Sequence, residues 1–220
     1  QKSLKTILLG LPAMKVVLFD MDHTLIDYPW NFFEEFALDI LDKYFGKRTD
    51  TRTALEIITE ETGYFQSQGV DEEEFWRIYN ELDPTNRLAA VRRGDIKPMA
   101  GAIELLSGLK QKNFHLGIVT TTPEISGRPL LEGLGLLNYF DDISFKGKIY
   151  NKPRPEPALQ ILNKLNGITK DVFFVGNSKN DMLCGKAVNA KTIHVKDNCR
   201  ECIADSCIKS LNEAGKIILG

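Results

Sequence analysis

The stretch Val16-Val17-Leu18-Phe19-Asp20-Met21-Asp22 decides the fold and contains the first functional candidates. Its first four residues form a short β-branched, aliphatic and aromatic run, which is typical of a buried strand. Side chains alternate along a strand, so Asp20 and Asp22 share one side if the strand geometry persists. Two neighbouring carboxylates repel each other, which raises the pKa of at least one, and a bound cation would relieve that repulsion. The pair can therefore supply a nucleophile, a metal ligand and a proton donor.

The composition is ordinary for a globular protein of 220 residues, with 43% hydrophobic and 26% charged residues. This length allows one large domain or a core with an insert. Lys and Arg total 28 and Asp and Glu total 30, giving a net charge of -2. This balance provides no long-range attraction for nucleic acid or an anionic membrane.

No apolar run reaches the roughly 18 residues of a membrane span. We expect a cytoplasmic protein without nucleic-acid or membrane partners, and the sequence gives no oligomeric state.

The first residues, 1–13, read as a leader. The segment 7–14 faintly resembles a signal-peptide core, but it runs straight into the first strand and leaves no room for a cleavage site. We therefore expect Met14 to be the natural start, preceded by an upstream or added segment.

The four cysteines are Cys184, Cys199, Cys202 and Cys207, and the last three form a Cys-x2-Cys-x4-Cys pattern. A structural zinc site normally uses four ligands, and no Cys or His pair lies nearby at matching spacing. His194 is close in sequence but is expected to end a strand. We expect free thiols of a reducing cytosol, with a metal or redox role as the less favoured alternative.

Apolar periodicity predicts a small all-helical insert over residues 28–96. The expected helices are 31–45, 53–64 and 71–82. Asp71 is the expected N-cap of the third helix, and Asp83-Pro84 is expected to stop it. Nothing in this segment reads as a strand.

Residues 14–27 and 97–220 alternate between strand and helix patterns, which predicts an α/β core with a doubly wound parallel sheet. After the first strand, the expected strands are 115–120, 142–145, 171–175 and 191–195, and the expected helices are 101–112, 127–137, 158–165, 182–188 and 203–211. Ligands bind such sheets at the carboxyl ends of the strands. Asp20, Thr120 and Asp181 fall at or just beyond these ends, and Lys152 lies in a connecting loop. We expect these residues to converge on one crevice.

Four segments resemble the motifs of the haloacid dehalogenase-like hydrolase superfamily, in its phosphatase branch. They are Asp20-Met21-Asp22-His23-Thr24-Leu25, Ile118-Val119-Thr120, Lys152-Pro153-Arg154-Pro155 and Gly176-Asn177-Ser178-Lys179-Asn180-Asp181. Each segment alone is weak evidence, but the ordered set is highly specific. The resemblance covers residues 14–195. It implies a Rossmann-like core, with residues 28–96 as a helical cap of the kind found in phosphoglycolate phosphatases.

The resemblance implies a Mg²⁺-dependent phosphatase for a small phosphorylated metabolite. Asp20 would be the nucleophile and form an aspartyl-phosphate, and Asp22 would protonate the leaving alkoxide and then activate water. Thr120, Thr121 and Lys152 would bind the phosphate, the lysine as a compact positive charge. Such charge is needed because a phosphate dianion repels an attacking carboxylate.

The metal would be held by Asp20, Asp22, Asn177 and Asp181, with Asp22 using its backbone carbonyl. The family usually carries Asp where this chain has Asn177. An amide offers an oxygen but no charge, so we expect weaker Mg²⁺ binding.

Two further departures stand beside the motifs: Thr121 replaces a frequent Asn, and His23 replaces a usual Gly. We interpret His23 as a tolerated substitution rather than a catalytic group. Read singly, each motif residue also has an ordinary structural explanation, such as a strand-end turn, a helix cap or a solvated lysine.

Two alternatives to the phosphatase remain open. One is a phosphomutase or phosphonatase on the same scaffold, although a phosphonatase needs a cap lysine and the insert is poor in lysine. The other is a catalytically impaired protein that binds phosphorylated ligands, which Asn177 motivates. A dehalogenase is disfavoured because it has no alkoxide for Asp22 to protonate. Candidate cap contacts to substrate, each with a competing structural role, are Trp30, Phe33, Arg52, Arg92 and Arg93.

Overall fold

The computed structural model describes residues 14–58, 63–147, 150–165, 169–196 and 202–220, so the predicted leader and Cys199 lie outside the described residues. The chain forms two compact units. One contains the described residues up to Asp27 together with those from Lys97 to Gly220, and we call it the core. The other is Tyr28 to Ile96, which we call the insert.

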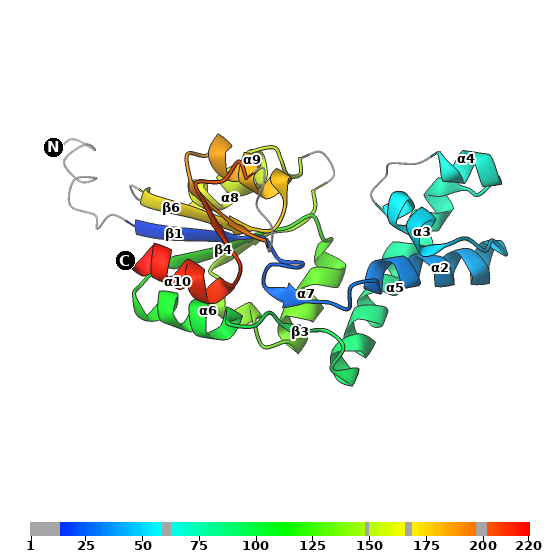
Figure 1. Ribbon diagram of the computed structural model, residues 1–220, viewed down its shortest axis with the longest axis horizontal. Helices are drawn as coiled ribbons and strands as arrows, with labels where there is room; N and C mark the ends of the chain where they lie inside the picture. The colour runs from blue at the N-terminus through cyan, green and yellow to red at the C-terminus, as the bar shows by residue number, and fades with distance from the viewer. Residues whose placement is uncertain (1–13, 59–62, 148–149, 166–168, 197–201) are drawn as a thin grey trace, which may run out of the picture. The chain divides into compact units, whose positions relative to one another are not determined.

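The core is built on a six-stranded parallel sheet in the order β5-β4-β1-β6-β7-β8 (Figure 1). The strands are β1 (Met14–Phe19), β4 (His115–Val119), β5 (Asp142–Ser144), β6 (Thr169–Gly176), β7 (Lys191–Val195) and β8 (Ser206–Ile208). The apolar run before Asp20 is β1, and it is central because β4 and β6 flank it. Residues Val16 to Phe19 are fully buried. The predicted α/β fold with a doubly wound parallel sheet is confirmed.

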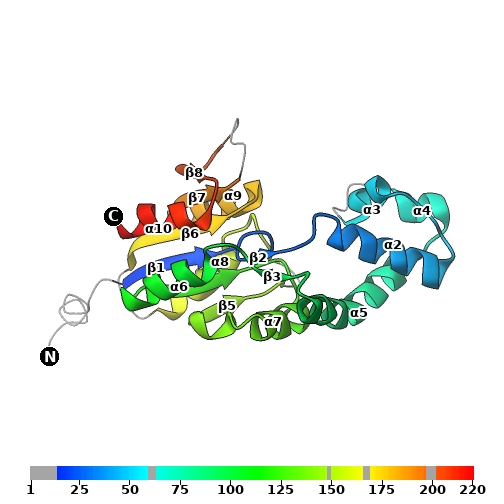
Figure 2. The same cartoon turned by 60° about the horizontal axis from the view of Figure 1, so that its bottom comes forward.

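Helices cover both faces of the sheet (Figures 1 and 2). The core helices are α6 (Ala102–Gln111), α7 (Glu124–Gly133), α8 (Glu156–Lys164), α9 (Lys179–Ala187) and α10 (Leu211–Leu219), with a short 3-10 turn at Leu137–Tyr139. Helices α8 and α9 share one apolar cluster with β1 and β6, whereas α6 and α10 pack together. The short strands β2 (Ile26–Asp27) and β3 (Lys97–Pro98) pair where the chain leaves and re-enters the core.

The described part of the insert is helical and contains no strand. Its helices are α2 (Phe32–Phe45), α3 (Thr51–Ile58), α4 (Tyr64–Gln68) and α5 (Glu72–Arg93). Asp71 caps α5 as predicted, because its side chain accepts a hydrogen bond from the Glu74 backbone at 3.1 Å. The insert has an apolar core of its own, made of Phe36, Ala37, Ile40, Leu41, Ala54, Ile57, Tyr64, Phe65, Val70, Phe75, Ile78 and Tyr79.

The predicted stop at Asp83-Pro84 is wrong, because α5 continues through Pro84 to Arg93. A proline inside a helix removes one hydrogen bond and costs about 3 kcal/mol. Here Asp83 and Arg87 stand one turn apart, both nearly inaccessible, and form an ion pair at 2.8 Å. Arg87 also donates to the Tyr28 hydroxyl at 2.6 Å. These buried contacts require the second half of the helix, so tertiary structure overrides the local signal.

The predicted last helix over 203–211 is also wrong, because β8 occupies Ser206–Ile208 and α10 begins only at Leu211. The strand forms by pairing with β7, with Ile193 opposite Ser206. The Asp205 carboxylate accepts hydrogen bonds from the backbone and hydroxyl of Thr192, both at 2.7 Å. Such long-range pairing leaves no local periodicity for a sequence pattern to detect.

The remaining core predictions agree with the structure apart from shifted ends. The largest shift is in α7, which begins at Glu124 rather than at residue 127 and ends at Gly133 rather than at residue 137. Asn189 follows α9 with a left-handed φ of 56°, as expected. Among the described residues, no helix combines the length and apolar character needed to cross a membrane.

Candidate active site

Asp20 stands directly after β1 at the carboxyl edge of the sheet and is only 6% exposed. Its Oδ2 accepts a hydrogen bond from the Thr24 hydroxyl at 2.8 Å, and its Oδ1 pairs with the Lys152 ammonium. Burial raises the pKa of Asp20 to about 7; Lys152 opposes this rise, and the charges of Asp181 and Asp22 add to it. Repulsion from Asp22 was the expected cause of a raised pKa, but desolvation is the larger one.

Lys152 links two carboxylates of the site. Its ammonium contacts both Asp20 and Asp181, the latter at 2.6 Å, and its side chain is 5% exposed. Burial alone would lower the pKa of Lys152, but the two carboxylates outweigh it and the net shift is upward. A lysine of this kind stays charged, so it supplies a fixed positive charge beside Asp20.

Asp181 is held at the start of α9 by a reciprocal capping box. Ser178 is the N-cap, and Asp181 Oδ2 accepts from its backbone at 2.9 Å and its hydroxyl at 2.6 Å. A purely structural role for Asp181 as the N-cap of this helix is therefore wrong, because the N-cap is Ser178, three residues earlier. Gly176 ends β6 beneath it, and an added Cβ there would lie 2.5 Å from the Asp181 Cβ. The glycine thus lets the fully buried carboxylate reach Lys152.

Asp22 lies near Asp20 and is half-buried. Its Oδ2 accepts a hydrogen bond from the Thr122 hydroxyl at 2.5 Å. The Thr120 hydroxyl oxygen in turn accepts from the Thr122 backbone at 3.0 Å, and Thr120 is buried. Thr121 is exposed. Of the two threonines predicted to bind phosphate, Thr120 is therefore buried and connected through Thr122 to Asp22, whereas Thr121 is exposed.

Thr24 and Thr122 are positioning residues that the sequence reasoning did not assign to these roles. Each uses its hydroxyl to hold one aspartate of the pair. The available signal was their place within or just after the motif segments, four residues past Asp20 and two past Thr120. Hydroxyl residues are common in such turns, so this signal does not separate a partner of a carboxylate from a cap.

Asn177 is half-buried at the same edge, between β6 and α9. The Thr24 hydroxyl lies 3.4 Å from its Oδ1, so Thr24 bridges Asp20 and Asn177. The site thus gathers carboxylate and amide oxygens around a single lysine. Magnesium prefers this kind of hard oxygen donor and usually keeps several waters. The donor set of Asp20, Asp22, Asn177 and Asp181 therefore fits a magnesium ion.

His23 adopts a left-handed backbone with φ of 57° in the turn after Asp22. Its backbone donates to the Ile26 carbonyl at 2.9 Å, which closes the turn. Glycine is favoured in such a conformation because it has no Cβ to clash. The turn geometry therefore explains why a glycine suits this position, and it supports the interpretation of His23 as a tolerated substitution.

The proposed cap contacts have mainly structural surroundings within the insert. Phe33 packs against Tyr28, with ring centroids 5.0 Å apart, and lies under the Arg87 guanidinium. Arg52 pairs with Glu56 and Arg93 with Asp95, in both cases on the surface. Trp30 is 82% exposed and Arg92 is exposed. Of these five, Trp30 is the large apolar side chain that stands out, because the described residues of the insert cover little of it.

The expectation of free thiols is wrong for two cysteines, because a disulfide joins Cys202 and Cys207. The predicted helix over 203–211 would have carried Cys207 along one cylinder away from Cys202. In the structure Cys207 instead lies in the strand β8, and the non-helical segment before β8 brings Cys202 next to it. Cys184 is free and buried, as expected.

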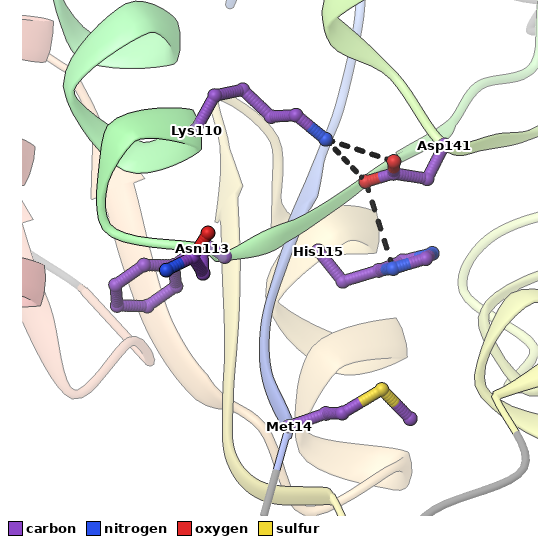
Figure 3. A pocket seen from close by; sticks show the side chains of 6 residues that line it. Met14, Lys110, Asn113, His115 and Asp141 are labelled. Carbon is purple, nitrogen blue, oxygen red and sulfur yellow. Dashed lines mark hydrogen bonds and ion pairs between the residues drawn. The ribbon is translucent and has the colours of Figure 1, made fainter. Parts of the chain in front are cut away.

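A separate pocket lies at the opposite end of the strands (Figure 3). Met14 and His115 begin β1 and β4, so they mark the amino edge of the sheet. Lys110 pairs with Asp141 there at 2.8 Å, and His115 lies 3.6 Å from the same carboxylate. This pocket contains none of the motif residues, so we assign it no part in the chemistry.

Comparison with known proteins identifies the family. The family model described as haloacid dehalogenase-like hydrolase matches residues 17–195. The chain belongs to this family, and the predicted resemblance is confirmed. It is therefore an enzyme of a hydrolase family, and the matched span contains every residue of the site.

Several proteins of similar sequence are phosphatases by name. A probable phosphatase, IndB of Dickeya dadantii, is 27% identical over 184 residues, which is 82% of this chain and 80% of that protein. A phosphoglycolate phosphatase of Colwellia psychrerythraea is 35% identical over 91 residues, only 41% of this chain and 40% of that protein. The solved structure of the putative HAD-hydrolase YfnB from Bacillus subtilis, bound to magnesium, has a TM-score of 0.72 at 19% identity. It covers 95% of this chain and 100% of that one. At that identity the likeness shows the fold.

Proposed function

We propose that this protein is a Mg²⁺-dependent phosphatase that hydrolyses a small phosphorylated metabolite through an aspartyl-phosphate on Asp20. The observation that carries the proposal is the contact of one buried lysine with two buried carboxylates at the carboxyl edge of the sheet. A structural ion pair needs one carboxylate for one lysine. The extra acidic groups, Asp22 and the second partner of Lys152, suit a site that receives a cation and a phosphate.

The first half of the reaction uses both aspartates. An Asp20 oxygen attacks phosphorus, the bond from phosphorus to the ester oxygen breaks, and the leaving oxygen takes a proton from Asp22. While the phosphoryl group moves from the substrate to Asp20, Lys152 neutralises part of the negative charge on its oxygens. The Thr122 hydroxyl, which donates to Asp22 Oδ2 at 2.5 Å, would hold the acid in place for this proton transfer. Thr120 and Thr121 are the proposed hydroxyl and backbone donors to the phosphate.

The second half restores the enzyme. Asp22, now ionised, takes a proton from a water molecule, whose oxygen attacks phosphorus and breaks the bond to Asp20. Inorganic phosphate leaves, with Asp20 ionised and Asp22 protonated. A magnesium ion held by Asp20, Asp22, Asn177 and Asp181 would supply additional positive charge for the phosphate. It would also favour the ionised form of Asp20, whose pKa is otherwise raised to about 7.

Three further facts support the proposal. The chain belongs to a hydrolase family, a relative matched over most of its length is named a probable phosphatase, and a protein of the same fold has been solved with magnesium. The substrate class follows from these names and from the aspartate pair, and the particular metabolite is left to experiment.

The test is phosphate release from an aryl phosphate and from a panel of phosphorylated metabolites, with Mg²⁺ and with a chelator. We expect phosphate release in the presence of Mg²⁺ and none with the chelator. The rate of release should fall by at least about a thousandfold in Asp20→Asn. Asp27→Asn is the matched control, because Asp27 lies just after the same motif, in β2, and pairs with Lys97 on the surface. Binding of phosphorylated ligands with no release from any compound would instead favour the impaired binding protein.

A further inference from the structure

A second cluster of metal-ligand residues lies at the end of β7, and it shares no residue with the proposed magnesium donors. His194, Cys202 and Cys207 each offer a nitrogen or sulfur atom, and these atoms all lie within 4.8 Å of one another. His194 and Cys207 are direct partners in the parallel pairing of β7 and β8. Residues at one register position of neighbouring strands face the same side, so the fold itself brings the two side chains together.

The His194 ring is fixed in an orientation that suits a metal ligand. Its Nε2 lies 2.8 Å from the Asn177 backbone carbonyl, and a carbonyl only accepts hydrogen bonds, so Nε2 carries the hydrogen. In the neutral ring, Nδ1 then presents a lone pair, and it lies 3.7 Å from the Cys202 sulfur. Histidines that bind metals are oriented in this way, by donating their second ring hydrogen to a carbonyl or carboxylate. His194 is 8% exposed, so little solvent competes for the ring.

The chemistry of the three groups selects a soft divalent cation. Two thiolates and one imidazole suit zinc, whose protein sites use these ligands in tetrahedral arrangements with a fourth position open to water. Magnesium prefers oxygen donors, so the two sites discriminate by ligand type. In the structure the two sulfurs are joined in the Cys202–Cys207 disulfide. A disulfide sulfur cannot act as a thiolate ligand, so the disulfide and a bound metal are mutually exclusive states.

We propose that reduction of the Cys202–Cys207 disulfide opens a zinc-binding site formed by His194, Cys202 and Cys207. With a phosphine as reductant, the bond between the sulfurs breaks and each sulfur gains one electron and one proton. The phosphine is oxidised to its oxide with the oxygen of a water molecule, which also supplies the two protons. Zinc then binds the two thiolates and releases those protons. The hydrogen bond from His194 to the Asn177 carbonyl is the connection between this site and the proposed active site.

The test uses the full chain, reduced with a phosphine, freed of reductant without oxygen, and titrated with Co²⁺ as a visible substitute for zinc. We expect one equivalent of Co²⁺ to give thiolate-to-cobalt charge-transfer absorption, and zinc to displace it. The oxidised protein should give no such absorption. Cys202→Ser and Cys207→Ser should abolish it, and His194→Asn should weaken Co²⁺ binding by at least about tenfold. Circular dichroism checks that each variant folds.

Cys184→Ala is the matched control, because Cys184 is the other described thiol and is buried in the core. Its removal should leave the cobalt absorption unchanged. The proposal is overturned if the reduced wild-type chain gives no charge-transfer absorption. It is also overturned if the absorption persists in the Cys202→Ser/Cys207→Ser double variant, or if Cys184→Ala removes it.

Discussion

Asp20 has an environment that resists its ionisation, yet its proposed role requires the ionised form. It is buried beside Asp181 and Asp22, and Lys152 is the cation that opposes their effect. Ionisable groups with shifted pKa values are common at sites that bind charged ligands. The charges that such a site needs for function lower the stability of the folded protein while the ligand is absent. The raised pKa of Asp20 can therefore be tested without a substrate, through the pH dependence of the unfolding free energy.

Replacing Asp20 by Asn should stabilise the metal-free protein in a pH-dependent way. The pKa of Asp20 is about 7 in the folded state against an ordinary 3.8. Between these values the folded protein keeps a proton that the unfolded chain has lost, so stability falls as pH rises toward 7 and is level above it. Asn cannot ionise. We expect Asp20→Asn to raise the free energy of unfolding by roughly 1–3 kcal/mol more at about pH 8 than at about pH 5.

Denaturant unfolding with a chelator present measures this difference. Asp39→Asn is the control, because Asp39 is a surface residue whose side chain is 70% exposed. A gain for Asp20→Asn that is equal at both pH values would contradict the burial of an ionisable Asp20.

Asn177→Asp should lower the Mg²⁺ concentration needed for half-maximal activity by roughly three- to tenfold. The added carboxylate would place a negative charge beside the Thr24 bridge to Asp20. Asn180→Asp is the matched control, because Asn180 is an exposed residue of the same helix start. An unchanged Mg²⁺ requirement, or an equal shift in the control, would sink the idea.

Prediction from sequence succeeded where the determining contacts are local. The strand before Asp20, the cap at Asp71 and the turn at Asn189 all follow from a few adjacent residues. It failed where distant segments decide. Helix α5 passes Pro84 because of a buried ion pair, and β8 replaces a helix because β7 is there to pair with it.

The same division holds within the site. Asp20, Lys152 and Asp181 were predicted to converge because strand ends of a parallel sheet meet at one edge, and the structure brings these three together. Thr122, which holds Asp22 across 100 residues of chain, could not be told from its neighbour Thr121. Which threonine turns inward depends on the backbone beyond β4, and no pattern in the sequence encodes that.

The Asp83–Arg87 pair accounts for the continuity of α5, so breaking it should be costly. Asp83→Asn removes the carboxylate that pairs with the buried Arg87 guanidinium at 2.8 Å, and we expect a loss of about 3 kcal/mol in unfolding free energy. Asp39→Asn removes an exposed pair with Lys43 at the same helical spacing and should cost no more than about 0.5 kcal/mol. Equal losses, measured by denaturant unfolding, would contradict this explanation of the helix.

At the scale of the whole molecule, the chain builds two compact units with separate apolar cores. The described site residues all belong to the core, on segments that follow β1, β4 and β6 or precede α8. The insert begins and ends at the short β2–β3 pair. The insert residues lie in a different unit from the aspartates, and we propose that they determine substrate choice.

The covalent role of Asp20 is the central claim, and one measurement tests it most directly. The protein is mixed with a substrate that it hydrolyses and Mg²⁺, quenched with acid within a single turnover, digested and analysed by mass spectrometry. We predict one added phosphoryl group on the peptide that contains Asp20, accumulating more strongly in Asp22→Asn and absent in Asp20→Asn. Full phosphate release by Asp20→Asn, or a phosphoryl group on another residue, would contradict the account.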